Sequence, residues 1–414
     1  MIINDRVKKI ILAIVFVILI IALATAIYLL FFKPLIRGSG RSASSTLDGQ
    51  GTLPGSGPGE GQIREDDGST RLPQQKQPIA VSNEISPSAQ GGLTETKKLN
   101  NDPVANAKLA KNGANINYYN KKDNKFYYLD RSGQAKPLSD KEFYDVESVT
   151  WSNQNNLAII EYPDGANIVY DFSNKKQTTL PTHWDDFSFS KNDDTLSMKL
   201  MGIDPDNRYL AVSNYNGSRV RPVEPLGIYA DTVTPTWSAN DQVIGIYSKG
   251  LGFERQEIFF IGQNNENFKS IVVQGRGFEH IWSPNGDKML YSTYTDDNKL
   301  RPTLWTVSSS GDNIGRDRRN LNLDTWAHKC VYYDETQIYC AVPEHLPEGA
   351  GFMPELGEGI PDNLYELDPL SGLKKLIAVP DGDYQMENLM VDKDGRYLYF
   401  VDQFTQNLHQ IRLK

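Results

Sequence analysis

The sequence has little of what most well-known enzyme classes need. It has no Gly-x-Ser-x-Gly elbow, no Gly-x-x-x-x-Gly-Lys phosphate loop, no His-Glu-x-x-His zinc motif and no Cys-x-x-Cys pair. It contains only two cysteines and five histidines among 414 residues. These absences argue against those enzyme classes, and we expect no metal site and no cofactor. Whether the chain has any catalytic activity stays open.

Acidic residues outnumber basic ones beyond the amino terminus. Residues 1–41 carry six Lys or Arg and one Asp, so the rest of the chain has 37 basic and 51 acidic residues, a net charge of −14. Nucleic-acid binding depends on Lys and Arg that neutralise phosphates, so nucleic acid is not an expected partner. Divalent cations, basic peptides and neutral glycans stay open.

Long apolar runs are absent except for one. Residues 10–32 form an uninterrupted apolar run of 23 residues, which is long enough to cross a bilayer as a helix. A cleaved secretion signal is the alternative, because Ala22-Leu-Ala24 resembles a cleavage site, but the run continues for eight residues past it. Residues 1–9 would form a short cytoplasmic tail. The Lys and Arg flanking the span are nearly balanced, whereas the short tail, the acidic remainder and the cysteine usage favour an extracytoplasmic carboxy-terminal domain on a single-pass membrane protein.

What the sequence does contain is a repeated hairpin. An apolar run ends at Trp282-Ser, turns on Pro284-Asn-Gly286 and returns as an alternating strand. Similar turns recur 38 to 59 residues apart, which makes seven copies, and Trp151 and Trp237 hold the position of Trp282. An isolated meander cannot bury its faces, so repeats of this length predict the four-stranded blades of a β-propeller.

The Trp282-Ser-Pro-Asn-Gly286 turn resembles the Trp/Phe-Ser-Pro-Asp-Gly turn of TolB-type β-propellers. The resemblance covers roughly residues 104–414, and it implies the fold and a binding role but transfers no catalytic residue. The Gly-His and Trp-Asp signatures of WD-type propellers are missing. We therefore predict an all-β, seven-bladed propeller at 104–414, with six blades as the alternative because the first copy is degenerate.

Residues 33–103 are rich in Gly, Ser and Pro, and we predict a flexible linker there. A ring must close its open edge, and the alternation of Leu93, Glu95, Lys97 and Leu99 predicts that residues 92–100 add a strand to the last blade. A disordered tail is the alternative. Cys330 and Cys340 are equally far from the centre of the sixth hairpin turn, which predicts a disulfide between paired strands, with two buried thiols as the alternative.

Aromatic, acidic and histidine side chains gather in the loops that enter the innermost strands and in those that join second to third strands. These loops open on one face, and the candidate binding residues there are His183, Trp184, Asp185, Asp186, Tyr229, Asp231, Phe278, Glu279, His280, Trp326, His328, His345, Phe352, Met353, Tyr384 and Glu387. Such residues around a concavity are typical of a ligand-binding funnel. The alternative for any one of them is that it caps a strand or fills the core.

The sixth copy carries a long insertion between its second and third strands. Residues 343–363 are rich in Pro, Gly and acidic residues, yet they include Leu346, Phe352, Met353, Leu356 and Ile360. A fully solvated loop does not need these apolar residues, so we predict that the insertion folds over the ring mouth or docks a partner. A packed surface flap without function is the alternative.

These patterns favour a membrane-tethered, extracytoplasmic propeller that binds a protein or glycan of the cell envelope, or serves there as a scaffold. One alternative is a glycan-active hydrolase or lyase that uses paired carboxylates such as Asp185, Asp186, Asp231 or Glu279. Another is a structural subunit of a pilus or secretion assembly.

Overall fold

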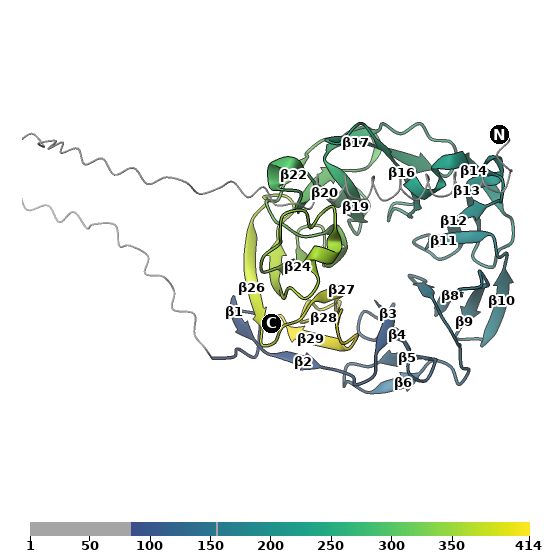
Figure 1. Ribbon diagram of the computed structural model, residues 1–414. Helices are drawn as coiled ribbons and strands as arrows, with labels where there is room; N and C mark the ends of the chain where they lie inside the picture. Colours follow the sequence, from purple (N-terminus) through teal and green to yellow (C-terminus); the bar gives the residue numbers. More distant parts are fainter. Residues whose placement is uncertain (1–83, 155) are drawn as a thin grey trace, which may run out of the picture. The chain divides into compact units, whose positions relative to one another are not determined.

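The structure is a computed structural model that describes residues 84–154 and 156–414. In this part of the chain seven sheets surround a common axis (Figure 1). The predicted all-β, seven-bladed propeller is confirmed, and the degenerate first copy forms a complete sheet. The predicted tail at 1–9, the span at 10–32 and the linker up to residue 83 lie outside the described residues. Within the described residues no helix is long and apolar enough to cross a bilayer.

Each blade runs from an innermost to an outermost strand. The first three blades consist of β3 (Val104–Leu109), β4 (Ile116–Asn120), β5 (Lys125–Leu129) and β6 (Ala135–Pro137); β7 (Ser148–Trp151), β8 (Leu157–Glu161), β9 (Asn167–Asp171) and β10 (Lys176–Leu180); and β11 (Trp184–Phe189), β12 (Thr195–Met201), β13 (Arg208–Asn214) and β14 (Arg221–Pro225).

Blades 4 to 7 follow the same order. They consist of β15 (Val233–Pro235), β16 (Val243–Gly250), β17 (Arg255–Gly262) and β18 (Ile271–Gln274); β19 (Arg276–Trp282), β20 (Lys288–Tyr294), β21 (Pro302–Ser308) and β22 (Arg319–Asn320); β23 (Cys330–Tyr332), β24 (Ile338–Pro343), β25 (Asp362–Leu367) and β26 (Lys374–Pro380); and β27 (Met386–Val391), β28 (Tyr397–Asp402) and β29 (Leu408–Arg412). Short 3₁₀ turns in the loops are η2 (Pro205–Asn207), η3 (Gly227–Thr232), η4 (Asp296–Asn298), η5 (Gly311–Asn313), η6 (Ala327–Lys329) and η7 (Pro354–Gly357).

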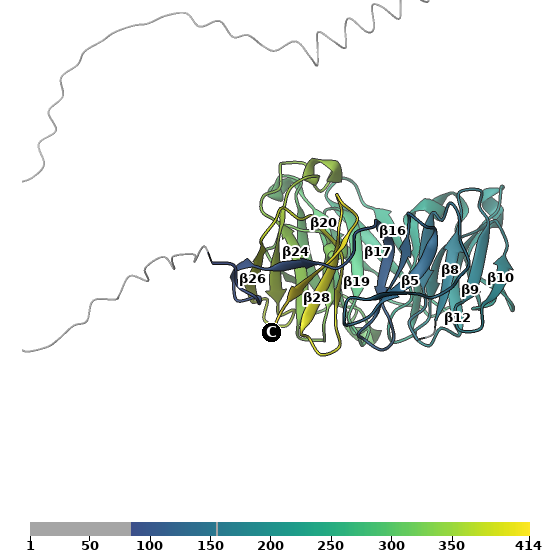
Figure 2. The ribbon, with the colours of Figure 1, turned by 90° about the horizontal axis from the view of Figure 1, so that it is seen from below.

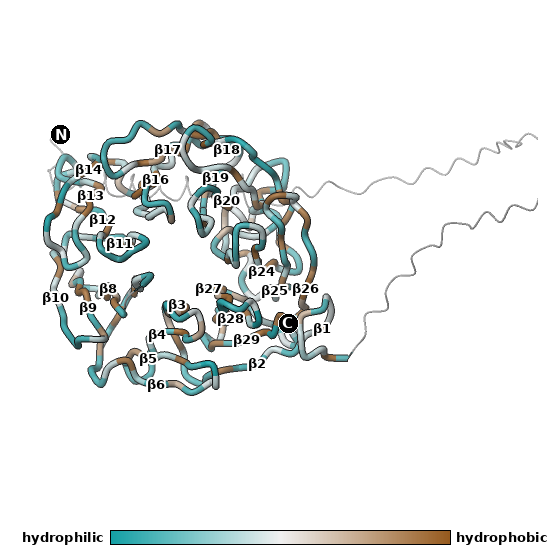
Figure 3. The backbone as a smooth tube through the Cα atoms, turned by 180° about the vertical axis from the view of Figure 1, so that it is seen from behind, coloured by the Kyte–Doolittle hydropathy of each residue, from teal (hydrophilic) through white to brown (hydrophobic). Residues whose placement is uncertain are grey.

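The core lies between neighbouring blades rather than within any one of them. Phe126 of blade 1 packs edge-on against Trp151 and Phe172 of blade 2, with ring centroids 5.5 and 5.1 Å apart. Figure 3 shows hydrophobic segments within the sheets and largely hydrophilic loops around the central opening and the rim. Because each sheet buries its two faces only against its neighbours, the ring is the smallest unit that can be stable.

The recurring Ser of the hairpin turn closes its own hairpin. Ser238 Oγ accepts a hydrogen bond from the backbone N of Val243 at 2.9 Å, and Ser283 Oγ accepts one from Lys288 at 3.2 Å. Gly286 has a φ of 75°, and a Cβ there would lie 2.7 Å from the backbone N of Asn240 in the hairpin turn of blade 4. The motif residues are therefore required by turn geometry and close approach, not by chemistry.

These hairpin turns also bond to one another around the ring. We call the side of the ring on which they lie the turn face. The opposite side is the loop face, and it holds the loops that enter the innermost strands and the loops that join second to third strands. Contacts between successive turns are Lys108 Nζ to Asn153, Asn153 N to Asp193, Lys191 N to Asp241, Asn240 Nδ2 to Gly286, Asn285 N to Glu335, Tyr333 OH to Lys393 and Lys393 N to Gly113. The turn face is thus a closed ring of contacts between neighbouring blades.

The segment predicted to close the ring forms two strands instead of one. β2 (Thr96–Lys98) pairs antiparallel with β29 and becomes the outermost strand of blade 7, while β1 (Gly92–Thr94) pairs parallel with β26 as a fifth strand of blade 6. Figure 2 shows this dark blue segment passing from β26 toward β28. The segment therefore joins blade 6 to blade 7.

The predicted disulfide between Cys330 and Cys340 is confirmed. The two cysteines are paired directly across β23 and β24, with Cα atoms 4.1 Å apart. The bond fixes the start of β23, the strand that η6 leads into.

Candidate functional site

β-bulges interrupt the innermost strands of blades 1, 3, 5 and 7. The register shifts within β3, β11, β19 and β27, and each shift includes a residue with positive φ, namely Asn106, Asp186, Gly277 and Asn388. In β19 and β27 the shifts adjoin Glu279 and Glu387. Bulges are common beside functional sites because they redirect side chains.

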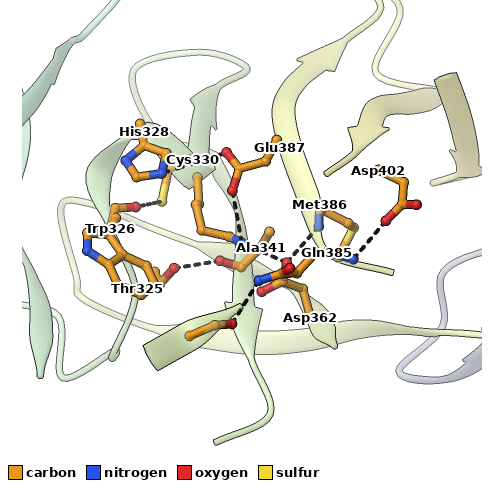
Figure 4. Close-up of polar contacts among 12 residues, drawn as sticks. Thr325, Trp326, His328, Cys330, Ala341, Asp362, Gln385, Met386, Glu387 and Asp402 are labelled. Carbon is orange, nitrogen blue, oxygen red and sulfur yellow. Dashed lines mark hydrogen bonds and ion pairs between the residues drawn. The ribbon is translucent and has the colours of Figure 1, made fainter. Parts of the chain in front are cut away.

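Three predicted site residues come together here, because His328 lies between Glu279 and Glu387. Its Nδ1 lies 2.7 Å from Oε2 of Glu279 in blade 5, and its Nε2 lies 3.7 Å from Oε2 of Glu387 in blade 7. His328 itself belongs to η6 before blade 6, and Figure 4 shows its ring beside Glu387. Its imidazole therefore lies between two carboxylates across three blades.

A buried ion pair between Lys329 and Asp362 contacts this cluster through Glu387. Nζ of Lys329 lies 2.8 Å from Oδ2 of Asp362 and 3.3 Å from Oε1 of Glu387, and both Lys329 and Asp362 are almost fully buried. Oδ2 of Asp362 also accepts a hydrogen bond from the backbone N of Met386 at 2.7 Å (Figure 4). Burial raises the pKa of Asp362 to about 6, although the charge of Lys329 opposes the rise. Lys329 thus connects the buried Asp362 to Glu387, the half-buried carboxylate near His328.

The insertion of blade 6 covers the space next to this cluster. Backbone N atoms of Gly349 and Gly351 donate to the carbonyls of Lys299 and Leu300 in the blade 5 loop. On the other side, the side-chain amide of Gln385 donates to Gly357 O at 2.8 Å and accepts from Gly359 N at 2.9 Å. The predicted insertion is therefore an ordered segment fixed to blades 5 and 7.

A cavity of about 180 Å³ lies between the insertion and the charged cluster. His328, Lys329 and Glu387 line one side, and Glu355 and Glu358 of the insertion line another. Trp326 also lines the cavity, and it packs against Leu346 and Ala350 of the insertion. The cavity is small, polar and bordered by more carboxylates than cations, which suits a basic or hydrogen-bonding group of a partner.

Predicted site residues of blades 2 to 4 do not join this cluster. Trp184 is buried in the core with Leu180, so for this residue the core alternative holds. His183, Asp185, Tyr229 and Asp231 are exposed, and Asp186 pairs with Lys199 at 2.6 Å.

The remaining predicted residues of blades 5 to 7 are divided between packing and exposure. Phe278 stacks on His280 with centroids 5.7 Å apart, and burial lowers the pKa of His280 to about 4, which leaves it neutral near pH 7. Tyr384 packs against the buried His409 with centroids 4.7 Å apart. His345, Phe352 and Met353 are exposed on the insertion. Sequence reasoning missed Lys329, Asp362 and Gln385.

Glu279 and Glu387 do not form the open pair of carboxylates that a glycoside hydrolase needs. Such enzymes hold two carboxyl groups on either side of the scissile bond. Glu279 and Glu387 lie instead at the two nitrogens of one imidazole, which fills the space between them. Among residues 84–154 and 156–414, no group of three His, Cys, Asp or Glu side chains is arranged to hold a metal ion.

Protonation of His328 should stabilise the native state. Burial disfavours its charged form, but the hydrogen bond and charge of Glu279 and the charge of Glu387 outweigh burial and raise the pKa of His328. This stabilisation is complete below the unfolded-state pKa of about 6.5 and is lost as the pH rises through the higher folded-state pKa. We expect His328→Gln to flatten this part of a melting-temperature profile from pH 5 to 9. The matched control is His183→Gln, and an unchanged profile in His328→Gln would contradict the assignment.

Comparison with known proteins supports the fold only. No protein-family model matches the chain, and no curated protein matches it. Among solved structures, oligogalacturonate lyase from Vibrio parahaemolyticus is 10% identical, with a TM-score of 0.50, and the match covers 77% of this chain and 93% of that one. Streptogramin B lyase is 9% identical, with a TM-score of 0.50, and the match covers 77% and 97%. A chain of the mitotic checkpoint complex is 12% identical, with a TM-score of 0.51, and the match covers 85% and 99%. At these identities the likeness establishes a β-propeller and no activity.

Proposed function

We propose that this chain is a membrane-tethered binding module of the cell envelope, whose propeller lies outside the cytoplasm and binds a protein partner on its loop face. The proposed tether is the apolar run at residues 10–32, and the proposed family relation is to TolB-type propellers through the Trp282-Ser-Pro-Asn-Gly286 turn. A glycan ligand or a scaffolding role in an envelope assembly would use the same face.

The observation that carries the proposal is the distribution of exposed apolar side chains. Of the sixteen large hydrophobic residues exposed in the described part of the chain, ten lie in loops of the loop face. They are Tyr144, Ile203, Ile228, Tyr229, Leu251, Phe253, Phe352, Met353, Leu356 and Phe404. Single exposed apolar residues are ordinary, whereas their concentration on one face of a protein is typical of an interaction surface.

The insertion offers part of this surface in a fixed conformation. Phe352 is 64% exposed and Met353 50% exposed, although their backbone N atoms both bond to Gly349 O at 2.9 Å. The ring of Phe352 also packs edge-on against Tyr294, with centroids 6.1 Å apart. A surface that is already ordered loses less conformational entropy on binding, which favours affinity. The charged cluster around His328 lies beside it and can set orientation.

The test is partner capture from intact membranes by crosslinking to the full-length chain. We expect the double variant Phe352→Ser, Met353→Ser to reduce the crosslinked partner by about tenfold or more, because buried aromatic anchors contribute most of the binding energy at interfaces. The matched control is Leu370→Ser, Leu373→Ser, which changes two exposed apolar residues of the loop between β25 and β26 on the turn face. Equal yields from the two double variants would refute the loop face as the binding surface.

A further inference from the structure

A second and larger cavity opens on the loop face between blades 4 and 5. Its volume is about 660 Å³, within the range of about 300 to 1,000 Å³ typical of small-molecule sites. The loop between β16 and β17 forms one wall, and the loop-face ends of β20, β21 and β22 form the other. It is separate from the cluster around His328, which lies between blades 5 and 7.

Aromatic rings line this cavity, and two of them are held by their neighbours. Trp305 stacks on the buried Tyr291 with centroids 6.3 Å apart and an interplanar angle of 11°. Tyr294 is supported by Phe352 of the insertion. Phe253 at the rim is 95% exposed. Fixed aromatic rings beside open space provide flat apolar surfaces on which a ligand can lie.

Hydrogen-bonding groups surround these rings. Asn298 Nδ2 donates to Oδ1 of Asp324 at 2.9 Å and to Oγ1 of Thr303 at 2.6 Å, which fixes the loop containing η4. Thr293 lines the cavity, is only 2% exposed, and its hydroxyl has no hydrogen-bond partner among the residues that the structure describes. A buried unpartnered hydroxyl is destabilising, and beside this cavity a water or a ligand could supply the missing bond.

The charge of the lining limits what can bind. Glu254, Asp296, Asp297 and Asp324 line the cavity, and none of its described lining residues is Lys or Arg. An anionic ligand would be repelled by these carboxylates. A long basic side chain would need only one carboxylate and a narrow slot, whereas this cavity is wide and also lined by amides and hydroxyls such as those of Gln274, Asn320 and Thr295.

From this geometry we infer that the cleft between blades 4 and 5 binds a saccharide that carries no carboxylate or phosphate, with a sugar ring stacked on Trp305 and its hydroxyls bonded to Thr293 and the surrounding carboxylates and amides. Carboxylate and amide oxygens accept hydrogen bonds from sugar hydroxyls, and the apolar face of a sugar ring packs on an indole. The site does not depend on the protein partner proposed above, because it is lined by a different set of side chains apart from Phe253.

The test measures the affinity of the full-length chain, in detergent micelles, for tetrasaccharides of matched length. The neutral probes are the tetramers of N-acetylglucosamine, glucose and mannose, and the anionic probe is tetragalacturonate. We expect at least one neutral tetramer to bind and to change tryptophan fluorescence, with tetragalacturonate about tenfold weaker or more, a difference of about 1.4 kcal/mol. Failure of every neutral tetramer to bind, or equal binding of tetragalacturonate, would overturn the inference.

Two variants locate the binding. Trp305→Leu should weaken binding of the neutral tetramer about tenfold or more through loss of stacking. Because Trp305 also packs on Tyr291, its variant is paired with Thr293→Val, which replaces the unpartnered hydroxyl by a methyl group of similar size. Thr293→Val should leave the melting temperature of the ligand-free protein unchanged or higher and still weaken binding severalfold. Unchanged affinity in Thr293→Val would show that the saccharide does not bind in this cleft. Crosslinking to a protein partner is a separate measurement, and we expect neither variant to change it.

Discussion

A chain that begins at residue 100 should be less stable than one that begins at residue 84 by at least about 3 kcal/mol, since each lost backbone hydrogen bond contributes about 1 kcal/mol. The shorter chain loses the bonds from Gly91 N to Ile377 O, from Leu99 N to Leu408 O and from Asp381 N to Thr94 O. It also exposes the outer edges of β26 and β29, and unpaired edges promote aggregation. Urea unfolding of the two chains, followed by tryptophan fluorescence, gives the difference.

The control for this deletion is the chain that begins at residue 84 compared with the full-length protein. Both keep β1 and β2, so we expect the same unfolding midpoint for the propeller. If the chain that begins at residue 100 also unfolds at that midpoint, β1 and β2 do not close the ring.

The repeat was predictable because its motif residues have local tasks. Ser238 and Ser283 each bond within their own hairpin, and Gly286 meets the neighbouring turn, so these residues are required at fixed offsets whatever the rest of the blade contains. The closing strand was predictable only in outline. The alternation from Leu93 to Leu99 reads as one strand, but the chain changes partner at Glu95, from β26 to β29. A change of partner is set by where two blades meet, which local sequence does not record.

Site residues were predictable where the topology brings loops together. They were not predictable where the role of a side chain depends on its burial. Glu279, His328 and Glu387 were expected on one face, and they meet because neighbouring blades aim their inner loops at the same side. Lys329 was missed because Lys is rarely buried, and its partner Asp362 lies 33 residues away across the insertion. The one available signal was a Lys set between His328 and Cys330 at the start of a strand. Gln385 was missed because its role is to bond the backbone of the insertion.

Lys329→Met should destabilise the propeller by about 3 to 5 kcal/mol, because removing one partner leaves the other charge buried and unpaired. The charge of Lys329 also opposes protonation of His328, so the pKa of His328 should rise in this variant. In the native protein the pKa of Asp362, raised to about 6, makes stability decrease as the pH rises from about 4 to 6, because the folded state then binds more protons than the unfolded state. Without Lys329 the pKa of Asp362 should rise further and extend this decrease to higher pH, as urea unfolding from pH 4 to 8 would show.

The double variant Lys329→Met, Asp362→Asn separates the unpaired charge from the lost packing. The amide that replaces the Asp362 carboxylate keeps an oxygen that can accept the hydrogen bond from Met386 N but has no charge, so much of the loss in Lys329→Met should be recovered. We expect a coupling free energy of about 1 to 3 kcal/mol between the two positions, as for side chains in direct contact. Because position 362 no longer titrates, its contribution to the decrease in stability between about pH 4 and 6 should also disappear in the double variant. Additive losses from the two substitutions would instead mean that Lys329 stabilises the fold through the packing of its aliphatic chain, and that the ion pair beneath His328 contributes little.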